Sequence, residues 1–381
     1  MFDFLQPLSN DLLIEFSPLS NQSLGKKVQF HTKENQPTLE ANSIAIIGVL
    51  DNRGSDYLVE HSNFNEIRKQ LYNLFPGNWS KNIYDLGDIL KGNTIEDTYF
   101  AVKTVCATLI KMQVVPLIIG GSQNITYAMY RSYDTLDQMV NVVTVDSKFD
   151  FENNHKKADA QSYLTRMIVD EPTNLFNFSN IGYQSYFNSQ EEIDLIEKLY
   201  FEAYRLGEVT QNITIAEPVF RDADLVSIDL TSVTSSVSCN LNPFNPNGFS
   251  GKEICTLARY SGISDKVSSF GVFNHNNSRQ EAALIVQIIW YFIEGFHYRL
   301  QETPSSKNQN FIKYIVPMED ETNLVFYKST LSDRWWIEVS NFNFSKKLVN
   351  SLLPCSHQDY LLATTQEIPN RWWKAQRKNC I

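Results

Sequence analysis

Apolar stretches of strand length alternate with helical patterns over residues 43–296, and this alternation constrains the fold more than any other feature. The stretch SIAIIGVL at 43–50 is typical, because it is apolar throughout and has no polar alternation. A strand that is apolar on both sides needs cover on both sides, as in a parallel sheet between two helical layers. The sequence therefore predicts an α/β fold, a three-layer α/β/α domain with a mostly parallel sheet.

The predicted elements follow one another at short intervals. Strands are expected over 43–50, 82–90, 114–122, 139–147, 174–184, 223–231 and 267–274. Helices are expected over 63–75, 94–113, 124–133, 191–207, 252–262 and 279–296. We divide the chain into an irregular N-terminal segment (1–42), the α/β domain (43–299) and a C-terminal appendage (300–381).

The appendage has a different character from the rest of the chain. It holds strand-like stretches at 323–330 and 334–340 and two Trp pairs, Trp335-Trp336 and Trp372-Trp373. Paired tryptophans suit either packing within the chain or a protein interface. We favour packing of the appendage within its own chain.

Charge and cysteine content exclude several classes of function. The formal net charge is -10, so we expect no nucleic-acid binding, which depends on Lys and Arg. Basic residues gather only in RWWKAQRK at 371–378. The chain has neither a basic, apolar leader nor a run of about 20 apolar residues, so we expect no signal peptide and no membrane insertion. Five cysteines without a CxxC pair predict no disulfide framework and a cytoplasmic location.

Polar residues follow three of the predicted strands. They occur in IIGGSQNIT (118–126), VDSKFDF (145–151) and SIDLTSV (227–233). In parallel sheets, ligands bind beyond the carboxyl ends of the strands. Functional side chains are therefore expected in these three segments.

The three segments resemble, in order and spacing, the strand ends of the arginase or ureohydrolase family. That family carries Gly-Gly-Asp-His, then Asp-Ala-His-x-Asp, then Ser-Phe-Asp-x-Asp. Further segments similar to family motifs are SIAIIGVLDNRGS (43–55), IGYQ (181–184), NPNGFSGKE (245–253) and VFNHN (272–276). The resemblance is greatest to the formimidoylglutamase and agmatinase-like branch. It implies a hydrolase in which two manganese ions activate a hydroxide that attacks a guanidinium or formimidoyl carbon.

The departures from the family concern the metal ligands. Carried over by position, the six ligands of the family fall on Gln123, Asp146, Lys148, Asp150, Asp229 and Thr231. A protonated lysine has no lone pair for a metal, and nearby carboxylates favour its protonated form. The resemblance therefore implies a vestigial site without the two-manganese centre. We expect no cofactor, or one divalent cation (Mn²⁺, Mg²⁺ or Ca²⁺) on the three aspartates.

Lys148 lies between two of these aspartates in the sequence. We interpret its ammonium as the counter-charge that replaces the lost metal and lets the aspartates share a buried site. A role for Lys148 as catalytic base or Schiff-base nucleophile is disfavoured, because it needs a depressed pKa. We assign no catalytic residue. The side chains expected to line the pocket are Ser122, Asn124, His155, Tyr183 and His275.

The leading hypothesis is a pseudoenzyme of the ureohydrolase fold that acts by binding or scaffolding. Its partners would be further copies of itself, in a homo-oligomer, or another protein. Two alternatives stay open. The first is a C–N bond hydrolase with a single metal on Asp146, Asp150 and Asp229, and the second is a sensor that binds a small molecule without turnover.

Overall fold

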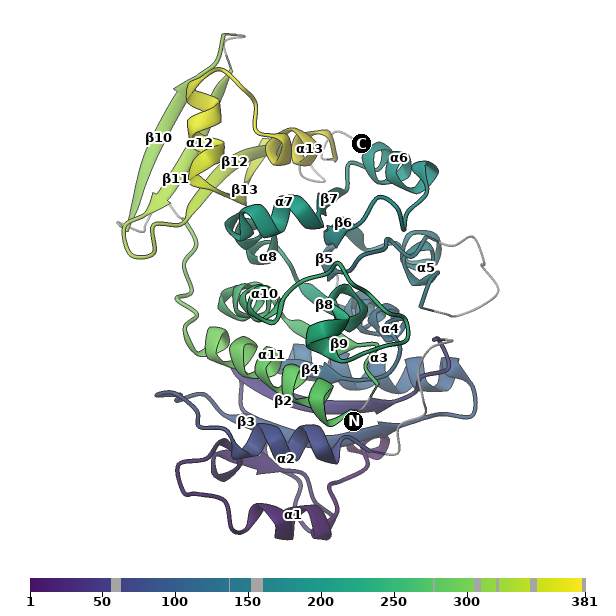
Figure 1. The fold of residues 1–381 in the computed structure, drawn as a ribbon. Coiled ribbons are helices and arrows are strands. Elements are labelled where there is room, and N and C mark those ends of the chain that lie inside the picture. The colour runs from purple at the N-terminus through teal and green to yellow at the C-terminus, as the bar shows by residue number, and fades with distance from the viewer. Residues whose placement is uncertain are drawn as a thin grey trace.

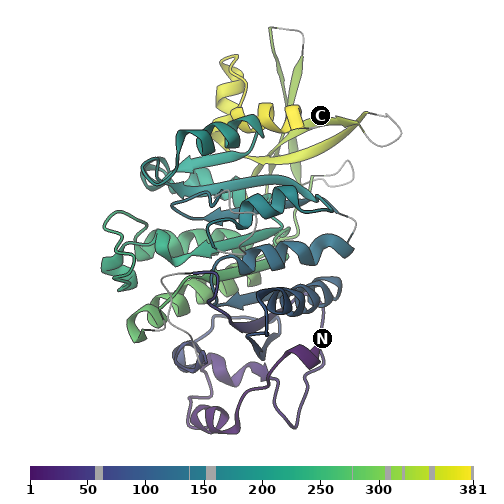
Figure 2. The ribbon, with the colours of Figure 1, turned by 90° about the vertical axis from the view of Figure 1, so that its right-hand side faces the viewer.

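The computed structural model describes residues 1–55, 63–136, 138–151, 160–276, 278–304, 310–319, 322–342 and 348–378. Within them, the main sheet has nine strands in the order β1-β3-β2-β4-β9-β8-β5-β6-β7. Neighbouring strands pair in parallel. Helices lie on both sides of this sheet (Figures 1 and 2). The predicted three-layer fold with a mostly parallel sheet is confirmed.

The strands of the main sheet are β1 (Val28–Phe30), β2 (Ser43–Leu50), β3 (Ile83–Leu90), β4 (Val114–Ile119), β5 (Val140–Val145), β6 (Leu175–Tyr183), β7 (Glu202–Arg205), β8 (Leu225–Asp229) and β9 (Ser269–Phe273). The helices that accompany it are α1 (Asn10–Phe16), α2 (Asn65–Asn73), α3 (Ile95–Lys111), α4 (Ile125–Arg131), α5 (Tyr163–Val169), α6 (Gln190–Lys198), α7 (Leu206–Gln211), α8 (Glu217–Arg221), α9 (Ser235–Ser238), α10 (Gly251–Ile263) and α11 (Arg279–His297). Short 3₁₀ turns are η1 (Phe2–Phe4), η2 (Leu24–Lys26), η3 (Ser132–Thr135), η4 (Ile213–Ala216) and η5 (Leu230–Ser232).

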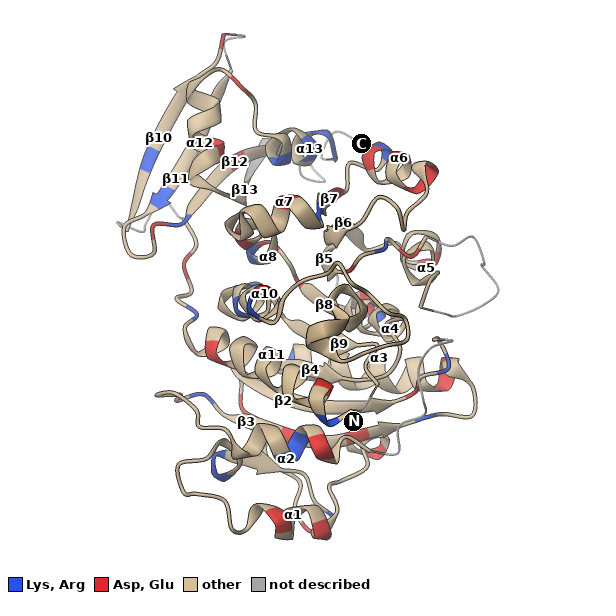
Figure 3. Cartoon of the chain, in the orientation of Figure 1, with Lys and Arg blue, Asp and Glu red and all other residues tan. Residues whose placement is uncertain are grey.

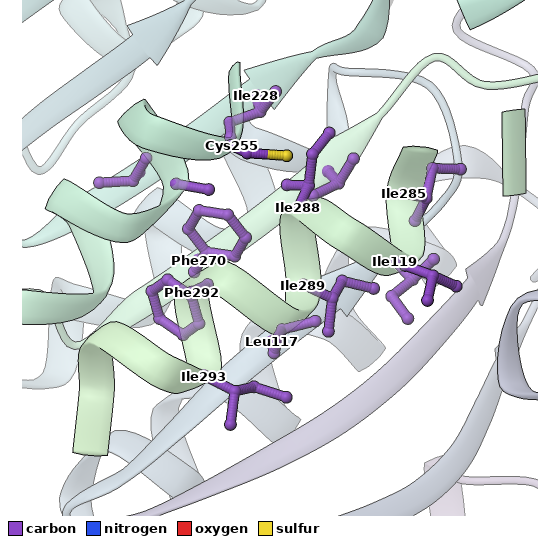
Figure 4. Packing of buried hydrophobic residues seen from close by; sticks show 14 of the residues in the cluster. Leu117, Ile119, Ile228, Cys255, Phe270, Ile285, Ile288, Ile289, Phe292 and Ile293 are labelled. Carbon is purple, nitrogen blue, oxygen red and sulfur yellow. The ribbon is translucent and has the colours of Figure 1, made fainter. Parts of the chain in front are cut away.

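Each face of the sheet has its own hydrophobic core. One core joins the sheet to α1, α2, α8, α10 and α11, and the other joins it to α3, α4 and α5. In the first core the ring of Phe292 on α11 stacks on Phe270 of β9, with 4.0 Å between the centroids (Figure 4). Apolar residues recur at helical spacing along α11, so one side of this helix is buried against the strands.

Two sequence predictions need correction. The segment 1–42 is predicted to be irregular, but it contains α1 and also β1, which joins the edge of the main sheet beside β3. These elements are too short to leave a periodic signal. The range 191–207 is predicted as one helix, but α6 ends at Lys198 and the chain then forms β7 from Glu202 to Arg205. Tyr200 adopts a left-handed φ of 55°, which breaks the helical path before the strand begins.

A second, antiparallel sheet lies at the β7 end of the molecule (Figures 1 and 2). Its strands are β10 (Phe311–Pro317), β11 (Asn323–Ser329), β12 (Trp335–Phe342) and β13 (Leu348–Cys355), followed by α12 (His357–Thr364) and α13 (Asn370–Lys378). Trp335 and Trp336 are buried. Arg221 of α8 donates to the carbonyls of Trp335 at 3.0 Å and Cys355 at 3.1 Å, which ties this sheet to the main domain.

Charged residues of both signs are distributed over the outer helices and loops (Figure 3). Among the helices of the described ranges, none combines the length and the apolar character that crossing a bilayer requires.

Candidate functional site

The loops that follow β4, β9, β8 and β5 meet at one edge of the sheet, because these strands are neighbours in that order. The loop after β4 begins with Gly120 and Gly121, whose φ angles are 89° and 74°. A Cβ atom on Gly120 would lie 2.2 Å from the Phe64 ring, so this close turn requires glycine. The turn brings Gln123 beside the loops after β5 and β8.

Asn274 connects three of these loops. Its Oδ1 accepts from the backbone N–H of Gln123 at 3.0 Å, and its Nδ2 donates to Asp229 Oδ2 at 2.8 Å. The other oxygen of Asp229 accepts from the backbone N–H of Thr231 at 2.7 Å. Both Asp229 oxygens are therefore engaged by donors of the chain itself. The sequence segment VFNHN contains Asn274, but nothing in its pattern predicts this contact.

Asp146 and Asp150 lie next to Asp229. Asp146 Oδ1 accepts from the backbone N–H of Lys148 at 2.9 Å. Asp146 Oδ2 and Asp150 Oδ2 are buried and meet no hydrogen-bond donor of the described residues when both groups are ionised. The two side chains lie within hydrogen-bonding reach of each other. One proton held between them satisfies both oxygens.

Burial controls the protonation of this cluster. It raises the pKa of Asp229 to about 8, and the charge of Asp146 adds to the effect. Burial and the charges of Asp146 and Asp229 raise the pKa of Asp150 well above its usual value. The pKa of Asp146 is also raised by burial, although donors and the charge of Lys148 favour its ionised form. The cluster therefore retains protons at neutral pH.

Gln123 and Tyr163 close the cluster on one side. Gln123 Nε2 donates to the Tyr163 hydroxyl at 3.2 Å, and the Gln123 side chain favours the ionised form of Asp146, which lowers the pKa of that carboxyl. Burial and the neighbouring aspartates raise the pKa of Tyr163 well above its usual value, so it remains a neutral phenol. Gln123 thus serves the cluster as a hydrogen-bond donor. Tyr163 follows no predicted strand, so no signal in the sequence points to its place in the cluster.

Lys148 is half-buried at the same edge of the sheet. Its side chain lines a cavity and forms no ion pair with any carboxylate in the part of the chain that the structure describes. Its charge still lowers the pKa of Asp146 and Asp150, which places the ammonium near them. Direct contact between the Lys148 ammonium and a carboxylate is not seen among the described residues, so its role as counter-charge stays a prediction.

The other predicted pocket residues have different surroundings. Ser122 and Asn124 are fully buried, where Ser122 Oγ accepts from the Gly54 N–H at 3.1 Å and Asn124 Nδ2 donates to the Tyr99 hydroxyl at 2.5 Å. These bonds fix the loop after β4 to its neighbours. His275 is buried against the ring of Phe64 at a centroid distance of 5.5 Å. His155 lies outside the described residues.

Tyr183 lines a smaller cavity of about 360 Å³, next to Gln184, Ser185 and Arg205. Its ring packs against Phe149 with 4.9 Å between the centroids. Tyr183 therefore lies beside the loop that carries the aspartates but borders a cavity separate from the one lined by Lys148.

The cavity beside Lys148 has a volume of about 680 Å³. Its polar lining consists of Lys148, Asp150, Gln161, Thr165, Asn188, Ser189, Glu191 and Glu192, and its apolar lining of Phe151, Ile168, Val169, Phe187, Leu195 and Leu199. Most of these residues belong to α5, to α6 or to the segment before α6. The sequence shows that these residues of α5 and α6 are apolar. Only the fold shows that several of them are exposed and that they share one cavity.

The residues present do not fit a two-metal centre. The resemblance places the two histidine positions on Gln123 and Lys148, and a protonated ammonium has no lone pair for a metal. Within the described ranges, no group of three or more His, Cys, Asp or Glu side chains is arranged to hold a metal ion. Two buried oxygens of the cluster, Asp146 Oδ2 and Asp150 Oδ2, have no donor among the described residues and are available to a cation.

Comparison with known proteins supports the resemblance seen in the sequence. The model of the Arginase family matches residues 51–292. A search of curated proteins finds no match.

Similar solved structures include two formiminoglutamases and an arginase. The Trypanosoma cruzi formiminoglutamase with Mn²⁺ is 18% identical, with 68% of this chain and 94% of that chain covered and a TM-score of 0.60. The Bacillus subtilis formimidoylglutamase is 17% identical, with 73% and 92% covered and a TM-score of 0.62. The arginase from Bacillus subtilis is 16% identical, with 66% and 98% covered and a TM-score of 0.54. At such identities these likenesses establish the fold alone.

Proposed function

Because the chain belongs to the arginase family, we propose that it is a member without the two-manganese centre, and that it binds a small molecule in its cleft without hydrolysing it. The observation that carries this proposal is the set of side chains at the six ligand positions. Gln123, Lys148 and Thr231 replace two histidines and one aspartate of the family. An ammonium has no lone pair to give to a metal, and Gln123 Nε2 here donates a hydrogen bond to the Tyr163 hydroxyl.

Hydrolysis of an amidine or guanidine needs an activated water. In two-metal sites the bridging ions supply it by lowering the pKa of the bound water. His275, which follows Asn274 in the chain, is buried against Phe64 and is not among the residues that line the cavity. The described residues therefore support binding better than hydrolysis.

The cleft itself is large enough to bind a ligand. Its volume of about 680 Å³ lies in the range of about 300–1,000 Å³ that is usual for small-molecule sites. The cavity adjoins the aspartate cluster at the carboxyl ends of the strands, where α/β proteins bind their ligands.

Two measurements on the purified protein test the proposal. Elemental analysis is expected to find no stoichiometric manganese, and assays with arginine, agmatine and formimidoylglutamate in excess Mn²⁺ are expected to release no urea, formamide or ammonia. Asp229→Ala is the control, because it removes the central carboxylate. Robust hydrolysis that this substitution abolishes would refute the proposal.

A single-metal C–N hydrolase is the second candidate. It is favoured by one observation, the two buried oxygens Asp146 Oδ2 and Asp150 Oδ2 that face no donor when both groups are ionised. All-oxygen sites suit Mg²⁺, Ca²⁺ or Mn²⁺. Stoichiometric metal that is lost in Asp150→Asn, together with turnover, would favour this candidate over pure binding.

Assembly with further copies or with a protein partner belongs to the same proposal. Leu241 and Phe244 support it, because both are more than half exposed in the loop between α9 and α10. Light scattering is expected to give a mass above that of one chain. A monomeric mass would contradict self-association, and a higher mass that Phe244→Ser leaves unchanged would contradict a role for this loop.

A further inference from the structure

The cavity beside Lys148 has an apolar wall that is open to solvent. Val169 of α5, Phe187 of the segment before α6, and Leu195 of α6 are 58%, 45% and 38% exposed. All three line this one cavity, and Phe151, Ile168 and Leu199 extend the same wall. Exposed apolar side chains that converge from separate elements on one concavity are typical of a ligand site.

Lys148 is the one cationic side chain among the described residues that line the cavity, and Asp150 lines it as well. The Lys148 ammonium has no ion-pair partner in the described residues. Its backbone is held firmly, because its N–H donates to Asp146 and its carbonyl accepts from Asn180 Nδ2 at 2.8 Å. A cation without an ion-pair partner can bind an anion through charge-assisted hydrogen bonds.

The surroundings of Lys148 restrict the kind of anion. A phosphate carries nearly two charges at neutral pH, but among the described residues that line the cavity Lys148 is the one cation, and Asp150 lines the cavity too. Glu191 and Glu192 line the cavity as well, so a ligand with several negative charges would meet repulsion. A carboxylate carries a single charge and matches a single ammonium.

We propose that this cavity binds an amphipathic monocarboxylate, with its carboxylate on Lys148 and its hydrocarbon body along the apolar wall. The proposal rests on the proposed function only in treating the cleft as a binding site. Lys148 would then be the anchor of the ligand, which gives a reason for a lysine at the position of a metal-binding histidine.

Calorimetry with simple probes in EDTA-containing buffer tests this. Octanoate supplies both the head group and the body, acetate supplies only the head group, and octylamine supplies the same body with a positive charge. Octanoate is expected to bind, and acetate and octylamine to bind far more weakly. Lys148→Met is expected to weaken octanoate binding at least about tenfold, since a charge-assisted hydrogen bond is lost.

Two further variants separate the anchor from the wall. Leu195→Asp changes only an exposed wall residue and is also expected to weaken octanoate binding about tenfold. Lys33→Met removes an exposed lysine elsewhere and is expected to leave binding unchanged. The proposal is overturned if octanoate does not bind, if octylamine binds as tightly as octanoate, or if Lys148→Met binds octanoate like the unchanged protein.

The outcome is independent of the test of the proposed function. A protein that hydrolyses amidines with manganese and also binds octanoate through Lys148 would refute only the non-hydrolytic role. A protein without metal or turnover that ignores octanoate would refute only the carboxylate site.

Discussion

Glu202 and Arg371 are 169 residues apart in the chain, yet Arg371 Nε lies 2.8 Å from Glu202 Oε2 in a buried ion pair. Glu202 begins the edge strand β7 of the main sheet, and Arg371 lies in the C-terminal helix α13. Two neighbours strengthen the contact: Lys374 Nζ donates to the carbonyl of Phe201 at 2.6 Å, and the Tyr204 hydroxyl donates to Glu202 Oε2 at 2.7 Å. The helix α13 therefore covers the outer edge of the main sheet.

Arg371→Met is expected to destabilise the protein by about 3 kcal/mol, because it leaves Glu202 buried without its counter-charge. Chemical denaturation followed by tryptophan fluorescence measures the loss. The matched control is Arg377→Met on the same helix, where the guanidinium is exposed and lies over the Trp373 ring at 5.3 Å. That control is expected to cost less than about 1 kcal/mol, and equal losses would contradict a special role for Arg371.

The same pair predicts a pH dependence. Burial favours the neutral form of Glu202, but Arg371 and Lys378 outweigh it and lower its pKa from 4.5 to about 2. A carboxyl whose folded pKa is depressed adds stability above its unfolded pKa and loses this contribution as the pH falls. Stability is therefore expected to decline between about pH 4.5 and pH 2.

Glu202→Gln tests this pH dependence. It is expected to remove this part of the decline, measured as the free energy of unfolding at each pH. An unchanged slope in the variant would mean that other carboxylates cause the decline.

The contrast between α13 and the main sheet shows what sequence could predict. Strands such as β2 and β5 consist mostly of apolar residues, so their burial on both faces and their parallel pairing could be predicted. The edge strand β7 has only four residues and continues an apolar spacing from α6, so its pattern predicts helix. Its pairing with α13 depends on long-range ion pairs, which no local pattern encodes.

The candidate site divides in the same way. Gly120-Gly121 and the aspartates after β5 and β8 follow recognisable motifs, and parallel topology brings their loops together. Asn274, Tyr163 and the cavity could not be predicted, because their roles depend on which side chains meet across α5, α6 and the strand ends. The orientation of Lys148 toward the cavity likewise required the structure.

Gly120→Ala is expected to destabilise the protein by at least about 2 kcal/mol and to disturb the loop that carries Gln123. The new methyl group would lie 2.2 Å from the Phe64 ring, at a φ of 89° that L-residues avoid. Gly207→Ala in α7 is the matched control, since no atom lies within 4 Å of the position that its new methyl group would take. Alanine there is expected to stabilise by about 0.5–1 kcal/mol, and thermal melts of both variants check the pair.

Asp150→Asn is expected to stabilise the metal-free protein by about 1 kcal/mol at neutral pH. In the unchanged protein, Asp146 Oδ2 and Asp150 Oδ2 lack a donor unless one proton is held between them. The amide of an asparagine at position 150 is a permanent donor that replaces this proton. The matched control is Asp85→Asn, because Asp85 is equally buried but pairs with Arg68 at 2.8 Å. That control is expected to lose about 3 kcal/mol.

Denaturation in EDTA and in excess Mn²⁺ separates the two functions proposed for the cluster. If the aspartates hold no cation, Asp150→Asn is more stable than the unchanged protein in both buffers, because the buried carboxylates gain a donor. If they hold one, Mn²⁺ stabilises the unchanged protein and the variant loses that gain, since ligand binding to the folded state adds to its stability. The change in the free energy of unfolding between EDTA and Mn²⁺, compared for the unchanged protein and Asp150→Asn, thus shows whether the aspartates hold a proton or a metal ion.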